Sequence, residues 1–158
     1  MDAAALQERF EAGSSLIVEA GALALGYFRR LATLTVVSKG PQDMASEADL
    51  DTEALIRGRL KERFPGDAFL GEETGHDDLS GAAGIWVVDP IDGTQPFVSG
   101  MGGWCVSIAF VLNGTVEMGF VYAPVRDELF IGRRGAVATL NGRPIRVSDA
   151  SALDRGVV

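Results

Sequence analysis

The chain of 158 residues has the length of one ordinary domain, and its 47% apolar and 23% charged residues exclude a disordered chain or a fibrous repeat. Its formal net charge of −8 disfavours a basic binding surface, so no nucleic-acid partner is expected. The same acidity does not suit a polyanionic substrate unless bound cations reverse the local charge, which is a first indication of metal.

Two helical patterns occupy the first part of the chain. Apolar and small residues recur on one stripe over residues 3–30 and predict a long helix. Residues 34–37 predict a strand, and residues 38–43 predict a turn. A second helix is expected after Ser46, a residue type that caps helix starts, and it should end at Pro65-Gly66-Asp67.

Two acidic residues, Asp49 and Glu53, fall on the apolar stripe of this second helix, seven and three residues before Ile56. An acidic side chain on a buried face is unusual unless it is paired or bound to metal. The alternative is that the first turn overhangs solvent, where acidic residues also favour the helix dipole. The pattern by itself leaves both interpretations open.

Two apolar segments, residues 68–71 and 85–88, predict short buried strands that run directly into acidic residues. Glu72 and Glu73 follow the first strand, and Asp89 follows the second. Neighbouring residues on an extended chain point to opposite sides, so only one of the two glutamates can easily share a site with the aspartate.

The second strand leads into Asp89-Pro90-Ile91-Asp92-Gly93-Thr94. Regular strand pairing is expected to stop at Pro90, which has no N–H group, and Thr94 is expected to cap a helix that begins near Gln95. Carboxylates at such a strand end attract hard divalent cations, and helix-start N–H groups attract phosphate. Taken alone, the two aspartates fit an ordinary strand end and turn equally well.

From residue 104 onward the pattern is β. Strands are expected over residues 104–112, 116–122 and 128–132, with a further hairpin over 136–147. Asn113-Gly114 is a strong hairpin turn. This meander predicts a largely antiparallel sheet with the two long helices packed on one face, an α+β fold. Residues 155–158 resemble the start of another strand, so the chain is expected to be a fragment.

The single cysteine, Cys105, excludes an intrachain disulfide, and its apolar neighbours indicate a small core residue. The single histidine, His76, lies in a polar run and is expected to be a loop residue rather than a base. The chain shows neither a signal-peptide pattern nor an apolar run long enough to span a membrane. We therefore expect a cytoplasmic protein with no membrane partner.

Four carboxylates stand where elements begin or end: Asp49, Glu72, Asp89 and Asp92. Converging carboxylates repel one another unless divalent cations lie between them. With almost no histidine or cysteine available, oxygen ligands favour Mg²⁺ or Mn²⁺ over zinc. The chemistry that this implies is metal-assisted attack of water on a phosphate ester.

The segments 71–73 (Gly-Glu-Glu) and 86–94 (Trp-Val-Val-Asp-Pro-Ile-Asp-Gly-Thr) resemble the first signature of the inositol monophosphatase family of Mg²⁺-dependent, lithium-sensitive phosphatases. The run 43–49 resembles an upstream acidic segment of that family, with Ser46 where threonine is commoner. The resemblance implies an αβαβα sandwich in which residues 1–158 form the N-terminal α+β metal- and phosphate-binding domain. The C-terminal αβα domain, which supplies a further metal-ligating aspartate, is expected to be absent from this chain. A homodimer is expected.

The resemblance also implies the metal ligands. Glu72, Asp89 and the carbonyl of Ile91 would hold a first ion, and Asp89 and Asp92 would bridge to or hold a second. The family implies roughly two or three Mg²⁺ ions, with Mn²⁺ as a possible substitute and inhibition by Li⁺.

Three further roles follow from the same resemblance. Glu72 and Thr94 would orient and deprotonate the attacking water. The backbone N–H groups of Gly93 and Thr94 would bind the phosphate. Asp49 would lie beside the catalytic threonine and is expected to hydrogen-bond to it.

The expected function is a Mg²⁺-dependent phosphomonoesterase that hydrolyses a small phosphorylated alcohol. Residues 95–100 replace the Thr-Asn-Phe run usual in true inositol phosphatases and are closer to the histidinol-phosphate phosphatase branch. The substrate is therefore expected to be inositol phosphate-like or histidinol phosphate-like, and the active site of the isolated chain is expected to be incomplete. The alternative is a non-catalytic half-domain that self-associates or binds another protein.

Overall fold

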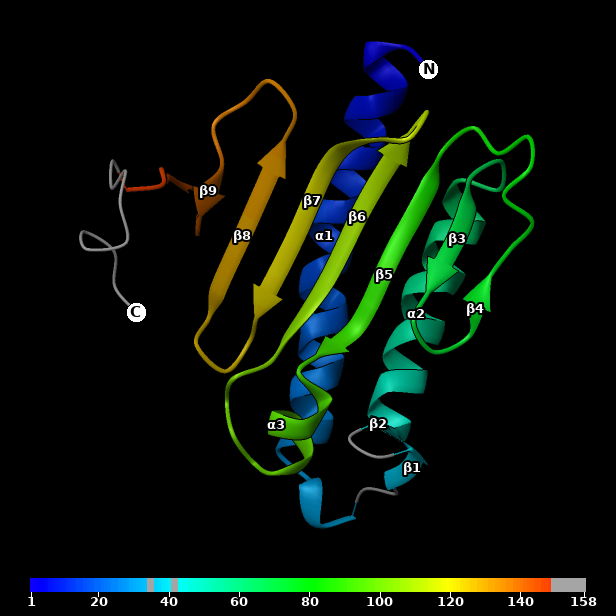
Figure 1. The fold of residues 1–158 in the computed structure, drawn as a ribbon. Helices are drawn as coiled ribbons and strands as arrows, with labels where there is room; N and C mark the ends of the chain where they lie inside the picture. Colours follow the sequence, from blue (N-terminus) through cyan, green and yellow to red (C-terminus); the bar gives the residue numbers. More distant parts are fainter. Residues whose placement is uncertain (34–35, 41–42, 149–158) are drawn as a thin grey trace.

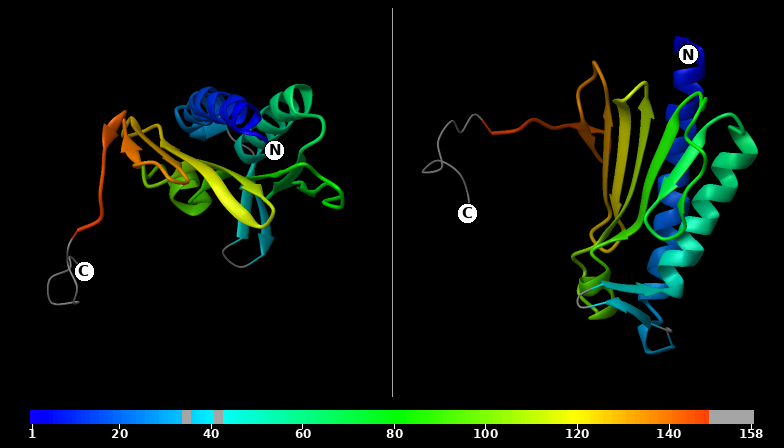
Figure 2. Two further views of the ribbon diagram at one scale, coloured as in Figure 1. Left: turned by 90° about the horizontal axis from the view of Figure 1, so that it is seen from above. Right: turned by 45° about the vertical axis from the view of Figure 1, so that its right-hand side comes forward.

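A computed structural model of the chain describes residues 1–33, 36–40 and 43–148. Helices α1 (Ala3–Phe28) and α2 (Glu47–Arg63) lie side by side on one face of an eight-stranded sheet (Figures 1 and 2). A short 3₁₀ helix (Leu31–Thr33) follows α1. The expected α+β fold, with two long helices on one face of a sheet, is confirmed.

The eight-stranded sheet is antiparallel except at one pair of strands. In spatial order its strands are β10 (Arg143–Pro144), β9 (Thr139–Leu140), β8 (Glu128–Arg133), β7 (Thr115–Ala123), β6 (Cys105–Leu112), β5 (Ile85–Asp92), β3 (Ala68–Gly71) and β4 (Gly75–His76). Strands β3 and β5 run parallel, with Gly71 opposite Val88, and the other neighbouring pairs are antiparallel. Because parallel strands end at the same edge, the chain segments that follow β3 and β5 meet there.

Two glycines bring α1 close to the sheet. A Cβ atom at Gly13 would lie 2.4 Å from the ring of Phe120, and a Cβ atom at Gly21 would lie 2.3 Å from the ring of Tyr122. Real Cβ atoms do not approach other atoms this closely, so any larger residue would push the helix away from β7. The small residues on the predicted α1 stripe therefore set the distance between helix and sheet.

Helix α2 begins where the sequence predicts. The hydroxyl of Ser46 accepts a hydrogen bond from the Ala48 amide at 3.2 Å, and the carboxylate of Asp49 accepts one from the Ser46 amide at 2.8 Å. This reciprocal arrangement is a capping box. Asp49 and Glu53 are only 1% and 0% exposed, so the interpretation in which they overhang solvent is wrong.

The predicted turn over residues 38–43 is wrong in its extent. Strand β1 (Val36–Gly40) continues to Gly40 and pairs antiparallel with β2 (Asp43–Ser46) in a separate two-stranded sheet. Pairing between the strands satisfies backbone groups that a loop would have to leave to water. Residues 34 and 35 of the predicted strand lie outside the described residues.

Regular pairing between β5 and β6 is interrupted at Pro90, as predicted, but β5 continues to Asp92, where pairing resumes opposite Cys105. The register between β5 and β6 shifts between Asp89 and Asp92, and a proline is tolerated at such an irregularity because no ladder hydrogen bond is needed from it. Helix α3 (Thr94–Val98) starts one residue earlier than predicted, and its N-cap is Gly93 rather than Thr94.

The β meander follows the prediction closely up to residue 133. The Asn113-Gly114 turn joins β6 to β7 with φ values of 51° and 75°, as a tight hairpin requires. The hairpin predicted over residues 136–147 is reduced to the two-residue strands β9 and β10, and the strand predicted at 155–158 lies outside the described residues. Within the described part of the chain, no helix combines the length and apolar character needed to cross a membrane.

Candidate active site

The ends of β3 and β5 bring two acidic residues together. The amide of Glu72 donates a hydrogen bond to the carbonyl of Val88 at 3.2 Å, which extends the parallel pairing by one residue. Glu72 therefore stands beside Asp89, the next residue of β5, and their carboxyl groups lie close enough to interact with each other. The sequence predicts this meeting from two apolar runs that each end in acids.

Besides burial, the proximity of Glu72 is one of the causes that raise the pKa of Asp89. Burial raises the pKa of Asp89 to about 7, and the hydrogen bond to Glu72 and the negative charges of Glu72 and Asp92 act in the same direction. The amide of Ile91, which donates to Asp89 at 3.1 Å, opposes the rise. A hydrogen bond between two carboxyl groups requires one of them to hold a proton.

Asp92 lies on the exposed side of this pair. Its carboxylate is 3.7 Å from the sulfur of Cys105, the residue opposite it in β6. Burial raises the pKa of the Cys105 thiol to about 11, with further contributions from the charge of Asp92 and its hydrogen bond to the thiol. Cys105 is half-buried beside the acids, so the interpretation of it as a core residue is wrong. Its apolar neighbours, Val106 and Ile108, point to the other face of the strand.

The start of α2 reaches the start of α3 through Asp49 and Thr94. One carboxylate oxygen of Asp49, Oδ2, accepts hydrogen bonds from the amide and the hydroxyl of Ser46, at 2.8 and 2.6 Å. The other, Oδ1, lies 3.4 Å from the hydroxyl oxygen of Thr94. The same hydroxyl lies 3.1 Å from the carbonyl oxygen of Ile91. A hydroxyl has one hydrogen, so Thr94 donates to one of these acceptors at a time.

Gly93 occupies a backbone conformation that other residues rarely adopt. Its φ is 97°, and a Cβ atom at this position would lie 2.9 Å from the carbonyl oxygen of Gly103. Both observations require glycine where the chain turns from β5 into α3. The backbone of Gly93 and Thr94, which the sequence predicts to bind phosphate, is therefore set in place by this turn.

The donor set fits a hard cation in its chemistry. Glu72, Asp89 and Asp92 offer carboxylate oxygens, and Ile91 offers a carbonyl, which are ligand types that Mg²⁺ prefers. Among the described residues, however, no three His, Cys, Asp or Glu side chains form a group ready to hold an ion. The structure thus joins Glu72 to Asp89, while Asp92 acts on the pair through its charge.

Of the hollows near these elements, two are compared with the site. One, of about 410 Å³, is lined by Asp92, Gly93 and Trp104 and by Arg126 and Glu128 beyond them. The other, of about 270 Å³, lies toward the end of α2, and none of the predicted site residues lines it. The first hollow is the one that adjoins the predicted phosphate-binding residues.

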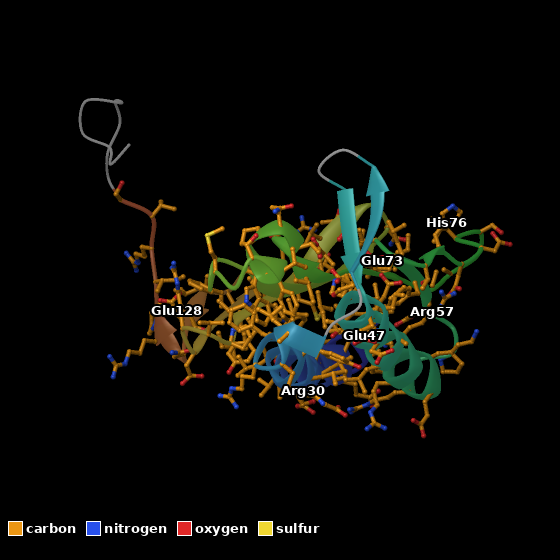
Figure 3. The ribbon with its side chains drawn as sticks, turned by 90° about the horizontal axis from the view of Figure 1, so that it is seen from below. Arg30, Glu47, Arg57, Glu73, His76 and Glu128 are labelled. Atoms are coloured by element: carbon orange, nitrogen blue, oxygen red, sulfur yellow. The ribbon has the colours of Figure 1, made fainter. Side chains whose placement is uncertain are left out.

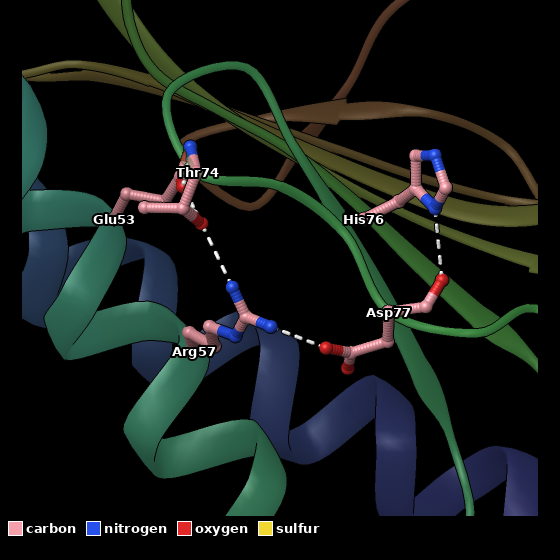
Figure 4. Close-up of polar contacts among 5 residues, drawn as sticks. All are labelled: Glu53, Arg57, Thr74, His76 and Asp77. Carbon is pink, nitrogen blue, oxygen red and sulfur yellow. Dashed lines mark hydrogen bonds and ion pairs between the residues drawn. The ribbon is translucent and has the colours of Figure 1, made fainter.

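The β3–β4 turn lies at the same end of the sheet as the predicted site residues, and polar side chains surround it. Figure 3 looks onto this end and shows His76 at its outer edge, away from Glu47 at the start of α2. The ring nitrogen Nδ1 of His76 is 2.9 Å from the carbonyl oxygen of Asp77, and the side chain is exposed (Figure 4). Glu53, by contrast, is buried and bonds the backbone of Glu73, a contact that the inward stripe of α2 indicates but that pattern alone does not assign.

Comparison with known proteins gives a consistent result. The model of the inositol monophosphatase family matches residues 5–158. Inositol monophosphatase 1 of Solanum lycopersicum is 44% identical over 130 residues, which are 80% of this chain and 47% of that protein. Histidinol-phosphatase of Chlorobaculum parvum is 39% identical over 133 residues, which are 84% of this chain and 51% of that protein.

A solved structure gives the same picture. The extragenic suppressor protein suhB of Bartonella henselae superimposes with a TM-score of 0.83 at 33% identity, over 94% of this chain and 56% of that one. The chain spans about half the length of the curated relatives that it matches, between 47% and 51% for the two proteins above.

Proposed function

The chain belongs to the inositol monophosphatase family. From this premise we propose that it supplies the metal- and phosphate-binding side of the active site of a Mg²⁺-dependent phosphomonoesterase. The observation that carries the proposal is the contact between Glu72 and Asp89. Burial, Glu72 and Asp92 raise the pKa of Asp89 to about 7, so this carboxyl group favours its proton, and among the described side chains no cation lowers that pKa. A divalent cation would take the place of that proton.

The ligands proposed for Mg²⁺ are the carboxylates of Glu72, Asp89 and Asp92 and the carbonyl of Ile91. When bound, the metal supplies charge stabilisation to a phosphate and lowers the pKa of water. The contact of Glu72 with Asp89 and the charge that Asp92 adds to them support this assignment. Oxygen donors alone favour Mg²⁺, with Mn²⁺ as a substitute.

The remaining residues of the proposed site handle water and phosphate. Glu72 accepts the proton of a water whose oxygen bonds to phosphorus as the bond from phosphorus to the alcohol oxygen breaks, and the alcohol oxygen leaves with a proton taken from a second water. Thr94 orients that water, because its oxygen accepts a hydrogen bond while its hydrogen goes to Ile91 or Asp49. The backbone N–H groups of Gly93 and Thr94 bind the phosphate, and the hollow beside Asp92 leaves room for the ester.

The proposed substrate class is a small phosphorylated alcohol, inositol phosphate-like or histidinol phosphate-like. Relatives with both names match this chain at 44% and 39% identity, which supports the class without choosing between its members. The purified chain should be assayed for phosphate release from an inositol monophosphate and from histidinol phosphate, with and without Mg²⁺, and the incomplete site that the resemblance implies predicts slow release. A difference in kcat/KM between the two would identify the substrate type.

Metal binding is tested without relying on turnover. Mg²⁺ at 100 times its Kd should raise the free energy of unfolding by about 2.7 kcal/mol, because it binds only the folded chain. Glu72→Gln and Asp89→Asn should each strongly reduce the rise, because each removes one of the proposed ligands. Asp78→Asn removes an exposed carboxylate elsewhere and should leave it unchanged. An equal rise in all four proteins would sink the proposed site.

A second candidate function is self-association or protein binding through the sheet face that α1 and α2 do not cover. The helices cover one face of the sheet (Figure 2). Along β6, Val106 and Ile108 are buried, whereas Ser107 and Ala109 alternate with them and stay half-buried. Light scattering would detect a dimer, and Ala109→Lys should dissociate it by placing a charge on that face. A monomer at all concentrations would eliminate self-association.

A further inference from the structure

Glu53 is a completely buried acidic residue on α2, one turn after Asp49. Burying a carboxylate is unfavourable unless hydrogen bonds replace the water that it loses. Its bonds go to a short segment, the turn of residues 72–74 that joins β3 to β4. This turn contains Glu72, the proposed metal ligand and base.

The carboxylate of Glu53 accepts three hydrogen bonds from the turn. Oε2 accepts from the amide of Glu73 at 2.8 Å, and Oε1 accepts from the amide of Thr74 at 2.8 Å and from the Thr74 hydroxyl. On the other side of Glu72, the backbone of Gly71 packs directly on the same carboxylate. A Cβ atom at Gly71 would lie 2.5 Å from it.

Arg57 ties the turn to α2 a second time (Figure 4). Its Nη1 donates to the Thr74 hydroxyl oxygen at 2.8 Å, and its Nη2 forms an ion pair with Asp77. The Thr74 hydroxyl thus accepts from Arg57 and donates to Glu53, which uses its one hydrogen and links the two charged side chains. Glu53 and Arg57 lie on successive turns of α2, so both contacts with the turn come from the same helix.

We propose that Glu53 is a positioning residue for Glu72, an inference that rests on the proposed function. The carboxylate holds both neighbours of Glu72, by packing against Gly71 and by bonding the amide of Glu73. Glu72 does not bond to Glu53 and remains directed at Asp89. A three-residue turn would otherwise place its side chain loosely. The buried carboxylate of Glu53 fixes the backbone from which the ligand projects.

Two variants disturb this contact by independent routes. Glu53→Gln replaces one acceptor oxygen by an NH₂ group that faces an amide N–H. Gly71→Ala keeps the glutamate at position 53 but places a methyl group 2.5 Å from its carboxylate, so the contact must shift. The matched control is Thr52→Val, because Thr52 is the adjacent buried residue of α2 and its hydroxyl oxygen has no hydrogen-bond partner in the described structure.

The first measurement is hydrogen exchange of the Glu73 and Thr74 amides in the full chain, which needs no metal. Both disturbing variants should raise these rates at least about tenfold, the factor expected for losing one hydrogen bond to a charged group. Thr52→Val should keep the wild-type rates, and melting curves identify any variant that fails to fold. Unchanged exchange in folded Glu53→Gln and Gly71→Ala would overturn the positioning role.

The second measurement is Mn²⁺ binding followed by electron paramagnetic resonance. Glu53→Gln should weaken binding by about 10- to 100-fold, as supporting residues around metal ligands do. The double variant Glu53→Gln/Glu72→Gln should bind Mn²⁺ as weakly as Glu72→Gln alone, because the ligand that Glu53 positions is then absent. Additive losses would overturn the inference. If the variants exchange faster but the wild-type chain does not bind Mn²⁺, the proposed metal site is refuted and the contact between Glu53 and the turn remains established.

Discussion

The carboxylate of Asp49, in the first turn of α2, lies 3.4 Å from the hydroxyl of Thr94, at the first residue of α3. Two helices that start 47 residues apart in the sequence, at Glu47 and Thr94, are therefore joined at their beginnings. The same hydroxyl is within reach of the Ile91 carbonyl, so the end of β5 belongs to this junction. The junction holds three segments of the proposed site together.

Replacing Asp49 should loosen this junction. Asp49→Asn loses an oxygen that either Ser46 or Thr94 uses, and a buried unsatisfied partner should lower the free energy of unfolding by about 1–3 kcal/mol. Urea denaturation measures the change. Asp51→Asn removes the same charge from an exposed position of α2 and should cost less than about 1 kcal/mol. Equal losses in the two variants would show that Asp49 acts only through its charge.

Stability should fall as pH rises through the range in which Asp89 titrates. Its pKa is raised from the ordinary 3.8 to about 7, first by burial and then by Glu72, so the folded chain binds a proton that the unfolded chain releases. This contribution is fully present below about pH 3.8 and is lost as pH rises through about 7. Urea midpoints between pH 4 and 8 should show a slope that Asp89→Asn removes. A slope that persists in the variant would locate the titration elsewhere.

Replacing Gly13 of α1 and Gly58 of α2 by alanine should change the stability of the fold in opposite directions. Gly13→Ala places a methyl group 2.4 Å from the ring of Phe120 and should destabilise the fold by about 1–3 kcal/mol despite the better helix propensity of alanine. Gly58→Ala, in an exposed part of α2 with nothing within 4 Å, should stabilise it by about 0.5–1 kcal/mol. Thermal unfolding of both variants decides whether close packing or propensity governs these positions.

A buried ion pair should dominate the stability of the end of the fold away from the site. Arg9 forms a bidentate pair with Asp67 at 2.8 Å on both contacts, and the Asp67 side chain is 1% exposed and also accepts from the Trp86 ring nitrogen. Asp67→Asn leaves a buried arginine without its counter-charge and should cost about 3–5 kcal/mol. Glu19→Gln, which breaks an exposed pair with Arg59, should cost much less in the same urea titration.

Local periodicity is what makes half of the site predictable. The 3.6-residue repeat of α2 places Asp49 and Glu53 inward, and both are buried. Apolar runs that end in acids predict the positions of Glu72 and Asp89 at neighbouring strand ends, and the structure brings them into contact. These inferences succeed because each depends on residues close together in sequence.

The rest depends on pairing between distant segments. Cys105 stands beside Asp92 only because of the register of β6 on β5, which no local pattern records. The hairpin of β1 with β2 and the continuation of β5 through Pro90 also require a partner strand. The same holds for Glu53, whose carboxylate is directed at a turn that lies twenty residues further along the chain. Its inward position is readable from the sequence, and its partner is not.

The exposed Asn113-Gly114 turn gives the molecule a useful handle. Strand β6 leaves the acids at Cys105 and runs for eight residues to Leu112 before this turn, so the turn lies roughly 24 Å from Asp92 at the spacing of extended chain. Exposed hairpin tips tolerate inserted segments. A fluorophore or peptide tag placed there would report on the molecule, or immobilise it, at a distance from the proposed site.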